Sequence, residues 1–187
     1  MKFKDLLAKT QFIKKYTNRK PKIDVITEAI IIANEGPKAG NIQPFQFVIV
    51  EDPEGIATIA EACQQSFIAK APYVIIVTSD VTQTKRLYGD KADKYIKQNV
   101  GAAVQNLTLQ LADSGISSSL VGPFSEETLR NNFGIPEGKE IEMIITLGEG
   151  MGEAKTMRSP ALINKIFFGS FGNKFHEPTT KVTRKDM

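Results

Sequence analysis

One stretch of the sequence combines turn-forming residues with polar side chains that could contact a ligand. Residues 36–45 read Gly-Pro-Lys-Ala-Gly-Asn-Ile-Gln-Pro-Phe. Gly and Pro are typical of tight turns, and Gly lets a ligand approach the backbone closely. The stretch also carries a cation, Lys38, and a side-chain amide, Asn41. It is too polar for a core, so we expect a preformed binding loop, called here the 36–45 loop.

A second candidate for chemistry is the basic segment around Lys14 and Lys15, in which cations alternate with apolar residues. Such a segment is either a solvated basic loop or a site that binds an anion through Lys14 and Lys15. The spacing alone leaves both readings open.

The rest of the sequence excludes several kinds of catalytic site. The single histidine, His176, has no zinc-type neighbours and cannot build a Ser-His-Asp triad. The glycines at 148, 150 and 152 do not have the spacing of a dinucleotide fingerprint. Cys63 lies in a helical apolar pattern and is predicted to be a buried structural residue. We therefore expect no catalytic side chain and no metal, and a cofactor would have to carry any enzymatic chemistry.

Composition places the chain among ordinary globular proteins. It has 187 residues, 41% of them hydrophobic, which suits one domain with its own core. The net charge of +3 is too small to indicate nucleic-acid binding but suits a small anionic ligand. No apolar run is long enough to span a membrane, and the N-terminus lacks a signal-peptide pattern. The single cysteine indicates a reducing, cytoplasmic setting.

The 36–45 loop lies between a predicted helix and a predicted strand. Asp24 is the expected N-cap of that helix, whose apolar face is Ile26, Ala29, Ile30 and Ala33. Gly36 is expected at the C′ position, and Pro37 prevents the helix from continuing. The strand follows at residues 46–51, so core elements hold both ends of the loop.

Other elements follow from the apolar patterns, and three of them leave alternatives open. Residues 80–94 are either a lid or an exposed segment. The helix at 94–113 carries small residues that suit either the domain centre or a dimer contact. The aromatic residues within 161–172 pack either on their own core or on a partner subunit. Further helices are predicted over 2–10, 53–65 and from 125, and further strands over 73–78, 117–121 and 140–147.

Several segments together resemble the nitroreductase family of FMN-dependent oxidoreductases, in family order and with family-like spacing, over about residues 8–160. Residues 37–50 resemble the family signature that begins with a Pro-containing loop and continues into a strand. The further segments are residues 71–76, 101–107, 115–124 and 133–136.

This resemblance implies an α+β fold with a central, mostly antiparallel sheet flanked by helices. It implies a single domain over residues 1–187 that forms a homodimer with FMN at the interface. Residues 153–187 would form a C-terminal extension that packs on the partner subunit. Hydride would pass from NADH or NADPH through flavin N5 to a quinone, nitroaromatic or similar small molecule, in ping-pong order. This transfer needs alignment over N5 rather than a protein acid or base.

The resemblance also assigns residues to the flavin site. The 36–45 loop would lie along the isoalloxazine ring of the partner's flavin. Gln64 or Gln65 would reach the polar edge of the ring, and the backbone at 120–122 would face N5. Lys155 and Arg158 would bind the phosphate, and Lys14 would lie near the ribityl and the N1/O2 edge. The cofactor-binding residues are thus Lys14, Pro37, Lys38, Ala39, Asn41, Gln65, Leu120, Val121, Gly122, Lys155 and Arg158.

One motif departs from the family pattern. Where relatives commonly carry Arg-Arg-Ser near the N-terminus, this chain has Thr10, Gln11 and Phe12. Each lost charged hydrogen bond would cost about 1.5–3 kcal/mol. Either Lys14, Lys155 and Arg158 carry the phosphate alone, or FMN binds weakly or differently. The departure motivates an alternative function, a flavin-binding sensor or carrier without general reductase activity.

Overall fold

The central strand of the sheet, β2 (Tyr73–Asp80), is covered on both faces, as its continuous apolar sequence predicts. The computed structural model describes residues 3–10, 13–152 and 165–174. In these residues the strand order is β1-β2-β4-β3, and each neighbouring pair is antiparallel. The other strands are β1 (Phe45–Val50), β3 (Ser117–Val121) and β4 (Lys139–Gly148).

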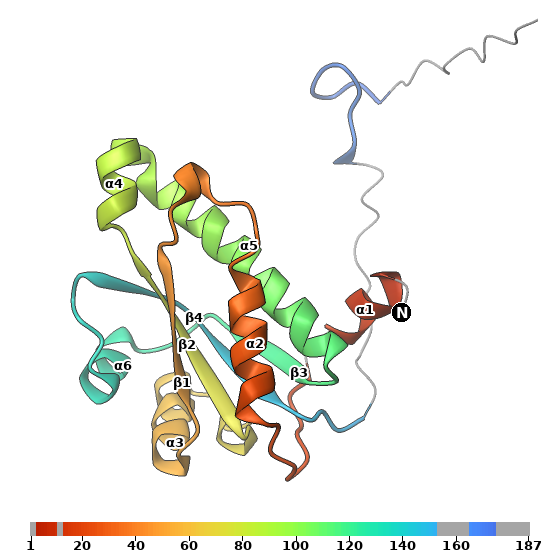
Figure 1. Cartoon of the computed structure of the whole chain (residues 1–187), viewed down its shortest axis with the longest axis vertical. Helices are drawn as coiled ribbons and strands as arrows, with labels where there is room; N and C mark the ends of the chain where they lie inside the picture. Colours follow the sequence, from red (N-terminus) through yellow and green to blue (C-terminus); the bar gives the residue numbers. More distant parts are fainter. Residues whose placement is uncertain (1–2, 11–12, 153–164, 175–187) are drawn as a thin grey trace, which may run out of the picture. The chain divides into compact units, whose positions relative to one another are not determined.

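Helices cover both faces of this sheet (Figure 1). Buried residues of α2 and α5 form one core with one face, and buried residues of α3 and α6 form a second core with the other. This arrangement confirms the predicted α+β class with an antiparallel sheet. The α-helices are α1 (Phe3–Lys9), α2 (Ile23–Ala33), α3 (Pro53–Ala62), α4 (Thr82–Tyr88), α5 (Ala92–Asp113) and α6 (Glu126–Phe133), and the short 3₁₀ helices are η1 (Ala39–Asn41), η2 (Ile68–Lys70) and η3 (Gly89–Lys91).

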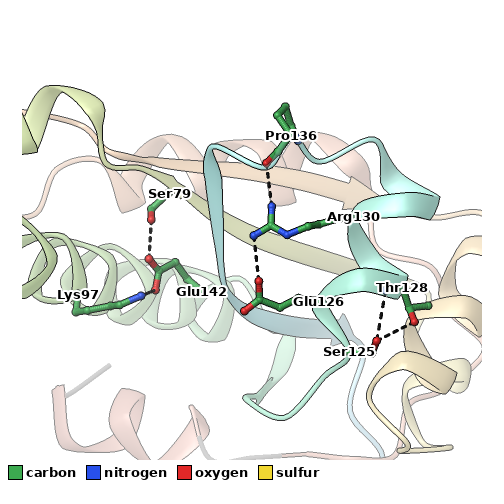
Figure 2. Close-up of polar contacts among 8 residues, drawn as sticks. All are labelled: Ser79, Lys97, Ser125, Glu126, Thr128, Arg130, Pro136 and Glu142. Carbon is green, nitrogen blue, oxygen red and sulfur yellow. Dashed lines mark hydrogen bonds and ion pairs between the residues drawn. The ribbon is translucent and has the colours of Figure 1, made fainter.

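A β-bulge interrupts the pairing between β2 and β4. Val77 pairs with Met143 and Thr78 pairs with Ile141, so Glu142 has no partner across the ladder. A residue at a bulge can point its side chain to the opposite face of the sheet from the one that regular alternation along the strand would give. Glu142 accepts a hydrogen bond from Ser79 Oγ at 2.6 Å and one from Lys97 Nζ of α5 at 2.7 Å (Figure 2). The bulge therefore aims this carboxylate at the α5 face of the sheet.

The ends of α3 and α6 follow from local sequence. Asp52 accepts a hydrogen bond from Gly55 N at 2.6 Å and caps α3. Ser125 caps α6 by accepting from Thr128 N, as predicted (Figure 2). Gly134 follows α6 with φ of 61°, the left-handed conformation that glycine adopts readily.

The predicted ends of α2 were wrong in two respects. Its N-cap is Lys22, without a side-chain cap, and Asp24 lies inside the first turn. The helix ends at Ala33 with Asn34 as C-cap, so Gly36 is not the C′ residue. A Cβ at Gly36 would lie 3.0 Å from Asn106 Nδ2. Gly36 thus serves the close approach of the loop to α5.

The chain divides into two compact units, Met1–Thr156 and Met157–Met187. In the second unit, the rings of Phe167 and Phe171 lie 4.7 Å apart, and Phe171 is 94% exposed. Most of the predicted C-terminal extension lies outside the described residues, so its packing stays a prediction. Across the described ranges, no helix combines the length and apolar character that a membrane crossing requires.

Candidate functional site

A hydrogen bond ties the 36–45 loop to α5. Ala39 N donates to Asn99 Oδ1 at 3.0 Å. Asn99 is 4% exposed and lies on the buried stripe of α5, between Ile96 and Val100. Asn99 Nδ2 has no hydrogen-bond partner among the described residues. A buried amide thus uses its acceptor on the loop while its donor stays unpaired.

The turn within the loop packs against α4. Gly40 and Asn41 both adopt left-handed backbone conformations, with φ of 61° and 53°. A Cβ at Gly40 would lie 2.6 Å from Leu87 Cδ2 and 3.0 Å from Tyr88 Oη. Figure 1 shows the loop beside α4. Residues 80–94 are therefore mostly helical. Many of their side chains are exposed, but α4 within this segment packs against the loop.

Lys38, a residue of the loop, also forms hydrogen bonds at the C-terminal end of α2. Its ammonium donates hydrogen bonds to the backbone carbonyl of Asn34 and, at 3.3 Å, to Asn34 Oδ1. A cation at a helix C-terminus satisfies free carbonyls and suits the helix dipole. Pro37 and Asn41 are exposed, and Ala39 is half-buried. The loop thus presents Pro37 and Asn41 outward, while Lys38 and Ala39 hold it to the protein.

A second group of predicted site residues forms around Lys14. Lys14 Nζ lies 4.7 Å from the ring centroid of Phe67, a cation–π contact. Phe67 packs on the core that contains Tyr16, Cys63 and Val121. Tyr16 Oη and Thr146 Oγ1 are hydrogen-bonded at 2.6 Å. The strand-like segment that carries Lys14 is thereby anchored to the sheet.

Gln65 and the backbone at 120–122 lie with this second group. Ser125 N, which follows the 120–122 segment, donates to Ala62 O at the end of α3 at 2.8 Å. Gln64 has a left-handed φ of 53°, and Gln65 N donates a hydrogen bond to Ala60 O at 3.1 Å. β3 is an edge strand, so its outer backbone groups are not used by the sheet.

The side chains at 120–122 differ in their surroundings. Val121 is buried in the α3 and α6 core, whereas Leu120 is 37% exposed and Gly122 is exposed. A Cβ at Gly122 would meet no atom of the described residues within 4 Å. The backbone here is therefore open to a ligand.

The two groups lie at opposite ends of the sheet. The loop enters β1 where Phe45 pairs with Ser79, near the end of β2. Near Lys14, a Cβ at Gly148 would touch both Tyr16 and Pro72, the residue before β2. β2 has eight residues, which corresponds to about 25 Å. One chain therefore does not bring the loop and Lys14 together.

Burial sets the ionisation of two groups in the core beside Lys14. It raises the pKa of Tyr16 to about 12, against a smaller lowering by the hydrogen bond with Thr146. It raises the pKa of the Cys63 thiol to about 11. Both groups are neutral near pH 7, and Cys63 is buried, as predicted.

Some predictions fall outside the described residues: Gln11, Phe12, Lys155 and Arg158. The phosphate-binding assignment therefore stays a prediction. Within the described ranges, His, Cys, Asp and Glu side chains form no group of three that could hold a metal ion.

Sequence reasoning missed Asn99, although a signal was available. It is a polar residue at a core position of a mostly apolar stripe that includes Ile96, Val100 and Ala103. Such a residue has to find a hydrogen-bond partner inside the protein.

Known proteins share both the sequence pattern and the fold. The sequence profile of the Nitroreductase family matches residues 7–70 and 61–149. A protein of Archaeoglobus fulgidus, described as a candidate NADH dehydrogenase/NAD(P)H nitroreductase, is 30% identical over 141 residues, covering 73% of this chain and 78% of the relative. An iodotyrosine deiodinase of Thermotoga neapolitana is 24% identical over 170 residues, covering 77% of this chain and 86% of the relative.

The fold agrees with a solved structure of an FMN-dependent nitroreductase from Clostridium difficile. The TM-score is 0.74 at 18% identity, over 89% of this chain and 98% of that chain. The family profile covers most of the chain and includes both groups of described site residues. The chain belongs to the Nitroreductase family, a family of oxidoreductases.

Proposed function

We propose that this protein is an FMN-dependent oxidoreductase that transfers hydride from NADH or NADPH to a quinone, nitroaromatic or similar small molecule. The observation that carries the proposal is the separation of the 36–45 loop from Lys14 within one chain. Both belong to the set that the family resemblance assigns to one flavin. A complete site then needs the loop of one subunit and the Lys14 group of another, which supports a homodimer.

The described residues fit a flavin in three respects. The loop exposes Pro37 and Asn41 on a turn held by internal contacts. The backbone at 120–122 lies at a sheet edge with open space beside Gly122. Lys14 is an exposed cation, which suits the N1/O2 edge of the ring and the anionic part of the cofactor. Bound FMN would supply the hydride chemistry that the side chains lack.

The chain's own residues would bind and orient the cofactor. Lys14 would stabilise negative charge at the N1/O2 edge, and backbone groups at 120–122 would fix the ring over the incoming substrate. Gln65 would hydrogen-bond the polar edge of the ring. Lys155 and Arg158 would pair with the phosphate.

Two relatives bear on the electron acceptor. The Archaeoglobus fulgidus protein carries a nitroreductase name, and the Thermotoga neapolitana protein is named an iodotyrosine deiodinase. The second relation supports an alternative acceptor class, a halogenated aromatic amino acid. The altered Thr10-Gln11-Phe12 motif supports a different alternative, a flavin-binding sensor or carrier.

The absorption spectrum of the purified protein tests the proposal. We expect flavin bands that bleach when NADH or NADPH is added without oxygen and return with an acceptor. Menadione, a nitrofuran and iodotyrosine are the acceptors to compare. Steady oxidation of NAD(P)H would exclude the sensor or carrier, whereas a colourless protein without a thermal shift on adding FMN would contradict both.

Two further proposals concern assembly and the phosphate. The protein would be a cytoplasmic homodimer, with residues 153–187 packed on the partner subunit. Light scattering after size exclusion would give twice the chain mass. Replacing Lys155 and Arg158 by Ala together should weaken FMN binding more than riboflavin binding. Equal loss for both ligands would remove the phosphate assignment.

A further inference from the structure

We propose that Asn99 is a positioning residue for the flavin site. Its side-chain amide holds the Ala39 N–H and so fixes the turn of the 36–45 loop in the conformation that the cofactor meets. The link to the cofactor rests on the proposed function, but the hold on the loop does not.

The orientation of the Asn99 amide follows from its partner. Ala39 N is a donor, so the atom that faces it at 3.0 Å must be the side-chain oxygen. A flipped amide would place two donors against each other. Nδ2 therefore points away from Ala39, and it finds no acceptor among the described residues.

The unpaired Nδ2 of Asn99 does not favour the stability of the folded protein. Asn99 is 4% exposed, and its neighbours on the stripe of α5 are Ile96, Val100 and Ala103. A buried donor without an acceptor is unfavourable, and an apolar side chain at this position would avoid it. Local rules are broken mainly where a protein needs a particular contact. The contact that Asn99 does make is the one with the loop.

The turn uses the left-handed backbone region at two consecutive residues, which Gly adopts freely and Asn tolerates at a modest cost. Asn41, which is not a glycine, has φ of 53° directly after Gly40 at 61°. The other hydrogen bonds of η1, Asn41 N to Lys38 O and Ile42 N to Ala39 O, remain inside the loop. Among the described residues, the Ala39–Asn99 bond is the one that joins η1 to another element. Without it, η1 would be held by side-chain packing, and the rest of the loop by the hydrogen bonds of Lys38 to Asn34 and by its ends.

Hydrogen–deuterium exchange of the protein without flavin tests the hold on the loop. In Asn99→Ala, peptides covering residues 36–45 should exchange about fivefold faster or more. Peptides of β2 and β4 should stay unchanged. Asn99→Asp keeps an oxygen that accepts from Ala39 N and should restore most of the protection. Asn131→Ala, at an exposed asparagine of α6, is the control and should leave the loop unchanged.

Two outcomes of the exchange experiment would overturn the proposal. Unchanged loop exchange in Asn99→Ala means that the bond does not hold the loop. Equal opening in Asn99→Ala and Asn99→Asp means that an acceptor at this position does not hold the loop, because Asp keeps both the oxygen and the shape of Asn.

A second experiment, the measurement of FMN affinity, tests the link between Asn99 and the cofactor. Asn99→Ala should raise the dissociation constant for FMN about tenfold, with the thermal stability of the flavin-free protein close to that of the parent. Unchanged FMN affinity despite an opened loop would overturn the link to the cofactor. A parent chain that binds no FMN would refute the proposed function and that link, while exchange would still decide the role of Asn99 in the loop.

Discussion

Glu142 and Lys97 form an ion pair whose two members differ sharply in exposure. Oε2 and Nζ are 2.7 Å apart, yet the Glu142 side chain is 4% exposed and the Lys97 side chain 60% exposed (Figure 2). The lysine can return to water if its partner is lost, whereas the carboxylate cannot. Replacing the two residues should therefore have unequal effects on the free energy of unfolding.

Lys97→Ala should destabilise the protein by about 1–3 kcal/mol, because it leaves a buried carboxylate without its cation. Glu142→Gln keeps a group that can bond Ser79 and should lower stability by less than about 1 kcal/mol. The double variant should be more stable than Lys97→Ala alone. Urea unfolding measures all three. Lys94→Ala, at an exposed lysine of the same helix, is the control, and equal losses for the two single variants would refute the argument.

Stability should depend on pH through Asp80. Hydrogen bonds from the Lys139 ammonium and from Thr82 lower the pKa of this carboxyl. A folded-state pKa below the unfolded value adds stability above about pH 4 that is lost as pH falls further. The pair is partly exposed, so the contribution is about 0.5–1 kcal/mol. Asp80→Asn should be less stable than the parent at neutral pH, with the gap closing in acid. A gap that persists in acid would point to the Thr82 cap instead.

Two glycines with the same backbone conformation separate strain from packing. Gly40 and Gly134 both have φ of 61°, but a Cβ at Gly134 would meet nothing within 4 Å in the part of the chain that the structure describes. Alanine at either position should cost about 1–2 kcal/mol of backbone strain. Gly40→Ala should cost about 1 kcal/mol more, because Leu87 and Tyr88 must move. Thermal unfolding compares the two variants, and Leu87→Ala should recover part of the difference only in the Gly40→Ala background.

Alkaline stability should depend on Tyr16. Burial raises its pKa to about 12, so the folded state holds the phenolic proton more tightly than the unfolded chain. The resulting stability is complete below about pH 10 and is lost as pH rises towards 12. Tyr16→Phe loses the hydrogen bond with Thr146 at every pH but should show a shallower alkaline decline. Urea midpoints near pH 8 and above pH 10 test this, and parallel declines would exclude Tyr16 as the titrating group.

Cys63 should resist alkylation in the folded protein. The thiol is buried, and its pKa is raised to about 11, so almost no thiolate is present at neutral pH. Iodoacetamide should modify it at the rate of global unfolding, and fully in urea. Rapid modification of the native protein, followed by mass spectrometry, would show that the α3 core opens locally.

Periodicity was sufficient to predict the main elements. Unbroken apolar residues identified β2, and the stripe at Ile96, Val100 and Ala103 identified α5, because burial on a fixed face leaves a repeating pattern. The start of α2 was missed because Asp24 has capping chemistry but lies inside the first turn. Gly36 was misread because glycine serves both left-handed turns and close packing, and only tertiary contacts distinguish them.

The candidate site was less predictable than the fold. Sequence identified the 36–45 loop by its turn residues, but not that Lys38 bonds Asn34 or that Asn99 holds Ala39. These contacts depend on how a loop returns to its neighbouring helices. Nor could the sequence place the loop and Lys14 at opposite ends of the sheet, because that separation follows from strand order.

The bulge at Glu142 also decides which charge faces Asp80. With the extra residue, Asp80 lies opposite Lys139 and Ser79 lies opposite Glu140. If the ladder ran without a shift from Val77 and Met143, every later pair would move by one residue. Asp80 would then face the carboxylate of Glu140, and Ile141 would leave the α3 and α6 core. The extra residue at the bulge therefore gives Asp80 an attraction in place of a repulsion, just before α4 begins at Thr82.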